Sequence, residues 1–221
     1  MEKDHSLRTW IGLGCLLGCL AQNAQAQPIL WLNHLDFLPG DATVNISHPY
    51  VQCPGAGGLS GLAITSTTLG ELGPASEIKV VYKGIEVPPT YRINAVRICY
   101  KNSSESSFIS QVRLCQLKNP PDSCLVRMDD PTNHTNVGPV CVNVPAGVDP
   151  SPDSDALEGA LRLSLTVNFG DLNDTICLLG VGLVGTAREK GPAACQDAVD
   201  NDGDGATDCD DPGCAGKRFC P

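Results

Sequence analysis

The chain has little positive charge, few histidines and no long apolar run beyond its first residues. It carries 15 Lys and Arg against 25 Asp and Glu, which gives a formal net charge of −10 at pH 7. Because nucleic acids are bound largely through their phosphates, so acidic a chain is a poor nucleic-acid binder. No segment after residue 26 is apolar enough to cross a bilayer, so we expect no transmembrane segment.

Catalytic motifs are also missing. The sequence Gly-Leu-Ser-Gly-Leu at 58–62 lacks the second glycine of a hydrolase nucleophile elbow. Gly55-Ala56-Gly57 does not complete a dinucleotide-binding fingerprint. The histidines beyond residue 26, which are His34, His48 and His134, do not have the spacing of a zinc motif. The sequence therefore predicts a protein that is not an enzyme, and we assign no catalytic residue.

The first 26 residues have the three parts of a secretory signal peptide. A polar, basic start precedes an apolar stretch at 10–21, which is too short to span a bilayer. Ala24-Gln25-Ala26 then forms a small-x-small cleavage site, so we expect export and a mature chain that begins at Gln27. A competing lipobox, Leu16-Leu17-Gly18-Cys19, would instead place a lipid anchor on Cys19.

Cleavage after Ala26 leaves ten of the 12 cysteines, an even number that indicates disulfides in an exported chain. They form two sets: Cys53, Cys99, Cys115, Cys124, Cys141 and Cys177 in the body, and Cys195, Cys209, Cys214 and Cys220 in the tail. We expect each set to pair within itself. Spacing does not choose among the pairings of the first set. In the tail we favour Cys195–Cys209 and Cys214–Cys220.

The hydrophobic pattern between residues 27 and 186 has a period of two, which is typical of β-strands with one buried face. The clearest case is 161–169, where leucine, valine and phenylalanine alternate with arginine, serine, threonine and asparagine. The predicted strands are 63–67, 78–87, 92–100, 108–117, 124–128, 140–144, 161–169 and 175–184, the last covered on both faces. Gly- and Pro-rich turns separate them, so we predict an all-β, disulfide-stapled, jelly-roll-like β-sandwich.

Three of these strands share the pattern Val-Arg-apolar, centred on Arg97, Arg113 and Arg127. If the strands are consecutive and antiparallel, alternation places the three arginines on one face of a sheet. Three guanidinium groups together could hold an anionic ligand such as a carboxylate-bearing glycan. The simpler interpretation is a solvated sheet face whose arginines have cross-strand partners.

The tail contains an acidic loop with the ligand spacing of an EF-hand-type calcium site. With Asp200 at position 1, the remaining ligand positions 3, 5, 7, 9 and 12 are occupied by Asp202, Asp204, Ala206, Asp208 and Asp211. Gly205 at position 6 permits the sharp turn, and Ala206 would offer its backbone carbonyl. Calcium prefers oxygen ligands, so we predict a Ca²⁺ site. The alternative is an acidic, solubilising tail.

This Cys-flanked Asp-x-Asp-x-Asp-Gly loop resembles thrombospondin type 3 repeats and dockerin loops, and resembles still more the short acidic motif near the C-termini of many secreted bacterial proteins. The resemblance covers residues 195–214 and implies calcium binding. It departs from an EF-hand because position 12 is Asp211 instead of Glu, the flanks lack amphipathic helices, and only one copy is present. An affinity of about 10⁻⁴–10⁻³ M, that of extracellular modules, is therefore expected.

The predicted organisation is a signal peptide at 1–26, a β-sandwich domain at 27–186, a linker at 187–194 and a calcium-binding tail at 195–221. We expect a secreted or cell-surface protein, of the kind found on bacterial surfaces, that binds an extracellular glycan or protein ligand. A second hypothesis is a small secreted polysaccharide hydrolase, for which Asp129/Asp130 and Asp153/Asp155 are candidate carboxylate pairs. A third is a structural coat or fibre subunit.

Overall fold

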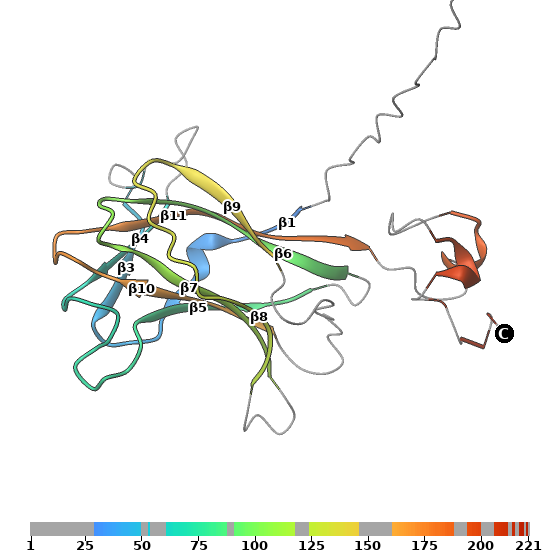
Figure 1. Ribbon diagram of the computed structural model, residues 1–221, viewed down its shortest axis with the longest axis horizontal. Helices are drawn as coiled ribbons and strands as arrows, with labels where there is room; N and C mark the ends of the chain where they lie inside the picture. The colour runs from blue at the N-terminus through green and yellow to red at the C-terminus, as the bar shows by residue number, and fades with distance from the viewer. Residues whose placement is uncertain are drawn as a thin grey trace, which may run out of the picture.

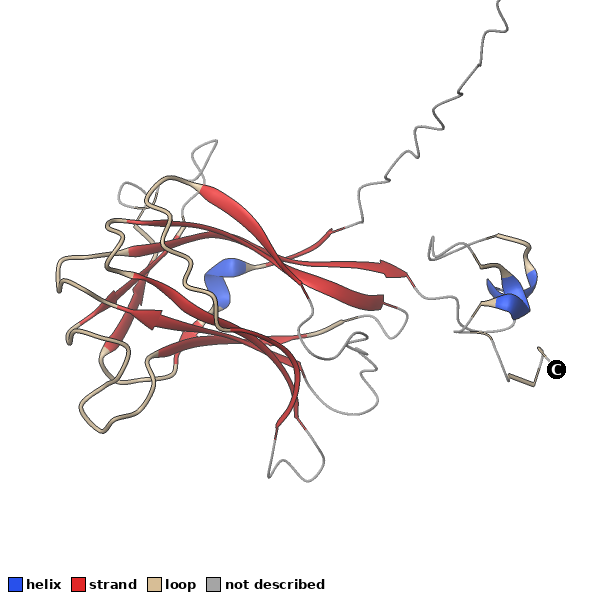
Figure 2. Cartoon of the chain, in the orientation of Figure 1, coloured by secondary structure: helices blue, strands red, loops and turns tan. Residues whose placement is uncertain are grey.

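Two antiparallel β-sheets pack face to face in this protein (Figures 1 and 2). The computed structural model describes residues 29–49, 53, 61–87, 91–117, 124–145, 161–187, 194–199, 206–211, 214, 217, 218 and 220. The six-stranded sheet contains β1 (Ile29–Leu32), β3 (Val44–Ser47), β4 (Leu62–Ser66), β6 (Tyr91–Asn102), β9 (Val140–Pro145) and β11 (Ile176–Ala187). The five-stranded sheet contains β2 (Leu38–Pro39), β5 (Val80–Ile85), β7 (Phe108–Leu117), β8 (Cys124–Asp130) and β10 (Leu161–Asn168).

The chain path through the sheets is that of a jelly roll. The strand order is β3-β4-β11-β6-β9 in one sheet, with β1 also paired to β11, and β2-β5-β10-β7-β8 in the other. In each of the consecutive pairs β4–β5, β6–β7, β8–β9 and β10–β11, the chain crosses from one sheet to the other. The two strands of each pair occupy the same place in the order of their sheets. The predicted all-β, jelly-roll-like sandwich is confirmed.

Alternation along β10 builds the core between the sheets. Leu163, Leu165 and Val167 are completely buried, whereas Arg162, which precedes them, is exposed. Burial of each such side chain contributes about 1.5–3 kcal/mol, which favours this face inward. The polar residues of the same strand consequently lie on the outward face of the five-stranded sheet.

Strand β11 is covered on both faces, as its continuous apolar sequence predicts. Val181 and Leu183 are buried in the core between the sheets. On the outward face, Cys177 forms a disulfide with Cys53, and Trp31 of β1 pairs with Gly182.

The other predicted strands are present, with ends that shift by at most three residues. The sequence pattern does not predict β1, β2 and β3, which are four, two and four residues long. Segments this short do not display a period of two, and their pairing with longer strands stabilises them. The described helices are η1 (His34–Asp36), η3 (Ala194–Gln196) and η4 (Asp208–Asp210), all single 3₁₀ turns. In the described part of the chain, no helix is long and apolar enough to cross a membrane.

All ten cysteines after residue 26 form disulfides, and the body and tail sets pair separately. The body bridges are Cys53–Cys177, Cys99–Cys141 and Cys115–Cys124, and the tail bridges are Cys195–Cys214 and Cys209–Cys220. The predicted tail pairs Cys195–Cys209 and Cys214–Cys220 are wrong. Turns at 208–211 and 211–214 fold the chain back, so that Cys214 is buried beside Cys195.

Candidate functional site

An open groove crosses the outward face of the five-stranded sheet, with a volume of about 460 Å³. It is lined by Gly40, Ile78, Val80, Tyr82, Gln111, Arg113, Cys115, Cys124, Val126, Arg162, Ser164 and Thr166. These residues come from β5, β10, β7 and β8, and from the segments beside β2 and β5. The groove therefore exists only because the fold brings together strands that are far apart in the sequence.

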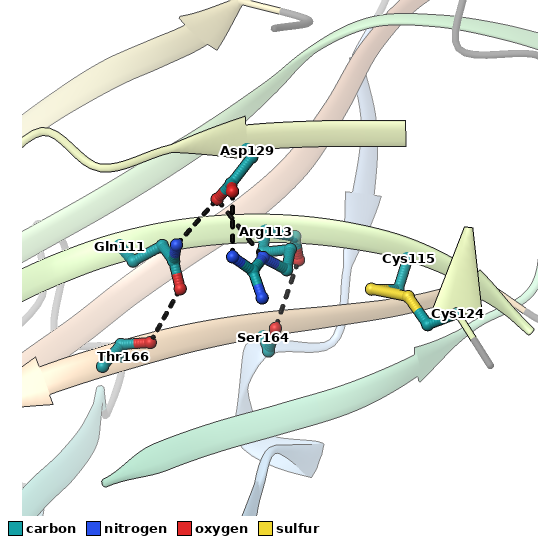
Figure 3. Close-up of polar contacts among 7 residues, drawn as sticks. All are labelled: Gln111, Arg113, Cys115, Cys124, Asp129, Ser164 and Thr166. Atoms are coloured by element: carbon teal, nitrogen blue, oxygen red, sulfur yellow. Dashed lines mark hydrogen bonds and ion pairs between the residues drawn. A yellow bond between two sulfur atoms is a disulfide. The ribbon is translucent and has the colours of Figure 1, made fainter. Parts of the chain in front are cut away.

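A network of hydrogen bonds joins three strands along the groove (Figure 3). Thr166 on β10 donates to Gln111 on β7 at 3.3 Å, and the amide nitrogen of Gln111 donates to Asp129 on β8 at 2.8 Å. Each of these side chains is oriented by a neighbour on the next strand. Polar groups held in this way are preorganised for a ligand that hydrogen-bonds along the sheet.

Arg113 completes this network as a two-point contact with Asp129. Its Nε and Nη2 atoms donate to the two carboxylate oxygens at 3.3 and 2.9 Å. Both side chains are partly exposed, so this ion pair contributes little to stability, about 0–1 kcal/mol. Its main consequence is geometric, because it fixes the guanidinium plane in the groove wall (Figure 3).

Tyr82 provides the aromatic surface of the groove. The guanidinium carbon of Arg162 lies over the Tyr82 ring, 6.0 Å from its centroid. Tyr82 pairs with Ser164 across β5 and β10, so the phenol and the serine hydroxyl lie side by side on the outward face. No ion pair of Arg162 is found among the described residues. This half of the groove thus combines the aromatic ring of Tyr82 with the guanidinium of Arg162, which can donate hydrogen bonds to a ligand.

The predicted cluster of three arginines is wrong. Arg97 lies on β6 in the six-stranded sheet, whereas Arg113 and Arg127 lie on β7 and β8 in the five-stranded sheet. The chain between β6 and β7 crosses to the other sheet instead of closing a hairpin, so Arg97 and Arg113 do not oppose one another. Arg127 donates to the buried Gln116 through Nε at 2.6 Å and also through Nη2. Of these three arginines, only Arg113 lines the groove.

The sequence pattern predicts the outward direction of some of the remaining groove residues. Arg162, Ser164 and Thr166 are the polar half of the clearest alternating strand, which predicts their outward direction. Tyr82 and Gln111 carry no motif, and the sequence gives no signal that their strands flank β10.

The acidic pair Asp129/Asp130 and the histidines His48 and His134 contact other groups of the protein. Asp129 is the network carboxylate, and Asp130 lies 3.3 Å from His134, which is buried. Burial lowers the pKa of His134, and the charge of Asp130 acts against that shift. His48 lies against the carbonyl of Leu35 at 3.1 Å. The pair Asp153/Asp155 lies outside the described residues.

The predicted calcium loop falls partly outside the described residues. Asp200, Asp202 and Asp204 belong to that part, whereas Ala206, Asp208 and Asp211 are described. Asp211 is buried, and Oδ1 of Asp208 accepts a hydrogen bond from the backbone of Ala198 at 3.0 Å. The described residues alone contain no group of three potential metal-ligating side chains.

No family model matches the chain, and no curated protein does. Among solved structures, it is similar to carbohydrate-binding modules of the β-sandwich superfamily with promiscuous specificity, at 13% identity and a TM-score of 0.44 over 69% of this chain and 58% of that one. It is also similar to the CBM22-1 and GH10 modules of a Clostridium thermocellum xylanase complexed with xylohexaose, at 8% identity and a TM-score of 0.44 over 74% of this chain and 28% of that one.

A third similar structure is the xylan-binding module CBM15, at 13% identity and a TM-score of 0.44 over 73% of this chain and 99% of that one. This chain thus spans less than two thirds of the length of the first two structures. The two-sheet architecture rests on the strand pairings of this chain itself.

Proposed function

We propose that this protein binds carbohydrate in the groove on the five-stranded sheet. The observation that carries the proposal is the row of oriented polar side chains beside Tyr82. A saccharide presents hydroxyl groups around an apolar ring face, so its binding site needs fixed hydrogen-bonding groups beside an aromatic surface. Gln111, Arg113, Ser164 and Thr166 provide the first, and Tyr82 provides the second.

Binding is favoured over hydrolysis by the way Asp129 is used. A glycosidase needs two carboxyl groups that flank the scissile bond, one of them free to exchange a proton. Both oxygens of Asp129 accept hydrogen bonds from Arg113, and Oδ1 accepts a further one from Gln111. A carboxylate whose two oxygens are engaged in this way orients its neighbours instead of facing a substrate.

The groove is tested by a glycan array followed by calorimetry with the glycans that bind. We expect Tyr82→Ala and Arg162→Ala each to weaken binding at least tenfold, because each removes a central contact surface. Lys101→Ala on β6 is the matched control, since Lys101 lies in the other sheet. Equal binding by all variants would place the site elsewhere. If no glycan binds and the protein assembles with itself, it is a structural subunit.

The proposed setting of this activity is outside the cell. The signal peptide predicted at 1–26 directs export, and the five disulfides suit an oxidising compartment. The proposed tail function is calcium binding at a single loop. Carboxylates and a carbonyl are the oxygen donors that Ca²⁺ prefers, and the buried carboxylate of Asp211 fits a ligand position. The Cys195–Cys214 disulfide brackets this loop, and Cys209–Cys220 joins the loop to the end of the chain.

Calorimetric titration of the full chain with calcium should give a dissociation constant of about 10⁻⁴–10⁻³ M. Asp200→Ala and Asp204→Ala should each abolish the binding heat, because each removes a charged ligand. Asp210→Ala is the matched control: it removes the same charge at position 11 of the loop, which is not a ligand position. An equal loss of heat in the control, or no heat at millimolar calcium, would identify the tail as an acidic appendage.

A further inference from the structure

Trp31 lies with much of its surface exposed on the outward face of the other, six-stranded sheet. It pairs with Gly182 of β11, and 55% of its surface remains accessible to solvent. Its neighbours in sequence, Leu30 and Leu32, pack against the core, which directs the indole outward. The exposed indole on this strand offers an aromatic surface to a ligand.

Two glycines form the floor beneath the indole. A Cβ atom on Gly182 would lie 3.2 Å from Cε3 of Trp31, and one on Gly180 would lie 3.4 Å from Cζ3. The six-membered ring therefore covers the backbone of β11 where side chains are missing. The ring is supported from below by two glycines, and its other surface is open to solvent.

Arg97 and Asn143 continue the row of cross-strand neighbours that begins at Trp31. Arg97 of β6 pairs with Gly182, and Asn143 of β9 pairs with Arg97, so Trp31, Gly182, Arg97 and Asn143 form one cross-strand row. Val96 and Ile98 are completely buried, so Arg97 points outward with Trp31. Its Nη1 donates to Oδ1 of Asn143 at 3.1 Å. We call this row, with Gly180, the Trp31 shelf.

The charge of the shelf selects its ligand. The protein has a net charge of −10, yet among the described residues no carboxylate is paired with Arg97. The indole covers β11, and the backbone of Arg97 on β6 lies one strand spacing, ~5 Å, beyond β11. The guanidinium of Arg97 extends further, to Asn143 of β9. A pyranose ring can stack its C–H groups on the negative face of the indole while a carboxylate on that ring reaches Arg97.

We propose that the Trp31 shelf is a second binding site, specific for uronic-acid residues of a glycan. It is independent of the groove, because the two sites lie on opposite sheets. Arg97 binds the carboxylate, Asn143 orients the guanidinium, and Trp31 carries the sugar ring. Because Gly180 and Gly182 have no side chains, the indole can lie flat against the sheet.

Fluorescence tests this site directly, because the sequence contains only Trp10 and Trp31. In the full chain with Trp10→Phe, all tryptophan emission comes from Trp31. Titration with a trimer of galacturonate should change this emission, whereas the fully methyl-esterified trimer, which keeps the rings but not the charges, should bind at least tenfold more weakly. Arg97→Ala should remove this preference, and Arg97→Lys should retain part of it.

Calorimetry with the same trimer measures the affinity of the shelf. We expect Trp31→Ala to abolish uronate binding and Lys101→Ala, which removes a cation from the same strand as Arg97, to leave it unchanged. Equal affinity for the charged and esterified trimers, or no emission change at millimolar trimer, would overturn the proposal. A concentration-dependent emission change without saccharide, accompanied by dimers in sedimentation, would overturn it too, because a second copy would then cover the shelf.

Discussion

Lys79→Met is expected to lower the free energy of unfolding by about 3 kcal/mol. Lys79 is completely buried just before β5, and its ammonium group donates to the backbone carbonyls of Thr68, Leu69 and Gly70 at 2.6, 2.8 and 2.8 Å. One side chain thus ties the loop at 68–70 to the five-stranded sheet. Methionine keeps the volume but removes all three hydrogen bonds.

The charge of Lys79 is compensated by Asp41, which is also buried. Burial lowers the pKa of the Lys79 ammonium, and the carboxylate of Asp41 acts against that shift. Hydrogen bonds from the side chain and backbone of Thr43 lower the pKa of Asp41, so this carboxyl is ionised at neutral pH. Loss of the ammonium therefore leaves a buried negative charge without its compensating cation, which adds to the cost.

Urea unfolding of Lys79→Met beside Lys83→Met measures this effect. Lys83 is the matched control: it pairs with Asp36 at 3.3 Å, and the Asp36 side chain is 58% exposed. A pair of that kind is worth about 0–1 kcal/mol. If the two variants lose equal stability, the loop carbonyls find other donors and the buried ammonium is not a stabilising tie.

The sheet architecture follows from sequence patterns that act locally. The alternation in β10 and the continuous apolar sequence of β11 predict which faces are buried, because burial is decided residue by residue. The sheet to which a strand belongs is decided by contacts far along the chain. The turn after Asn102 reads as a hairpin, yet the chain there crosses to the other sheet, and the predicted arginine cluster fails for that reason.

The two candidate sites illustrate the same limit. The groove needs β5, β10, β7 and β8 in that order, and only Arg113 among its residues is a predicted ligand-binding residue. The Trp31 shelf depends on β1, a four-residue strand that the periodicity does not predict. The placement of the indole depends on Gly182, its partner on β11, and on the nearby Gly180, and neither strand alone indicates that register.

The even number of cysteines predicts that disulfides form. The number of residues that each disulfide encloses becomes known only when the pairing of the cysteines is known. Cys53–Cys177 spans 124 residues and joins the segment before β4 to β11, whereas Cys115–Cys124 spans nine residues between β7 and β8. A disulfide restricts the unfolded chain more as its loop lengthens. The longest bridge in the body should therefore contribute most to stability.

We expect the double variant Cys53→Ala/Cys177→Ala to lose about 4–5 kcal/mol of unfolding free energy, and Cys115→Ala/Cys124→Ala to lose about 2–3 kcal/mol. Both cysteines of the first pair are buried in a small cluster with Ala63, so their replacement also removes packing at β11. Urea unfolding of the two variants measures the difference. An equal or larger loss for the nine-residue loop would show that strain or packing at the bridges, and not the restriction of the unfolded chain, sets their contribution.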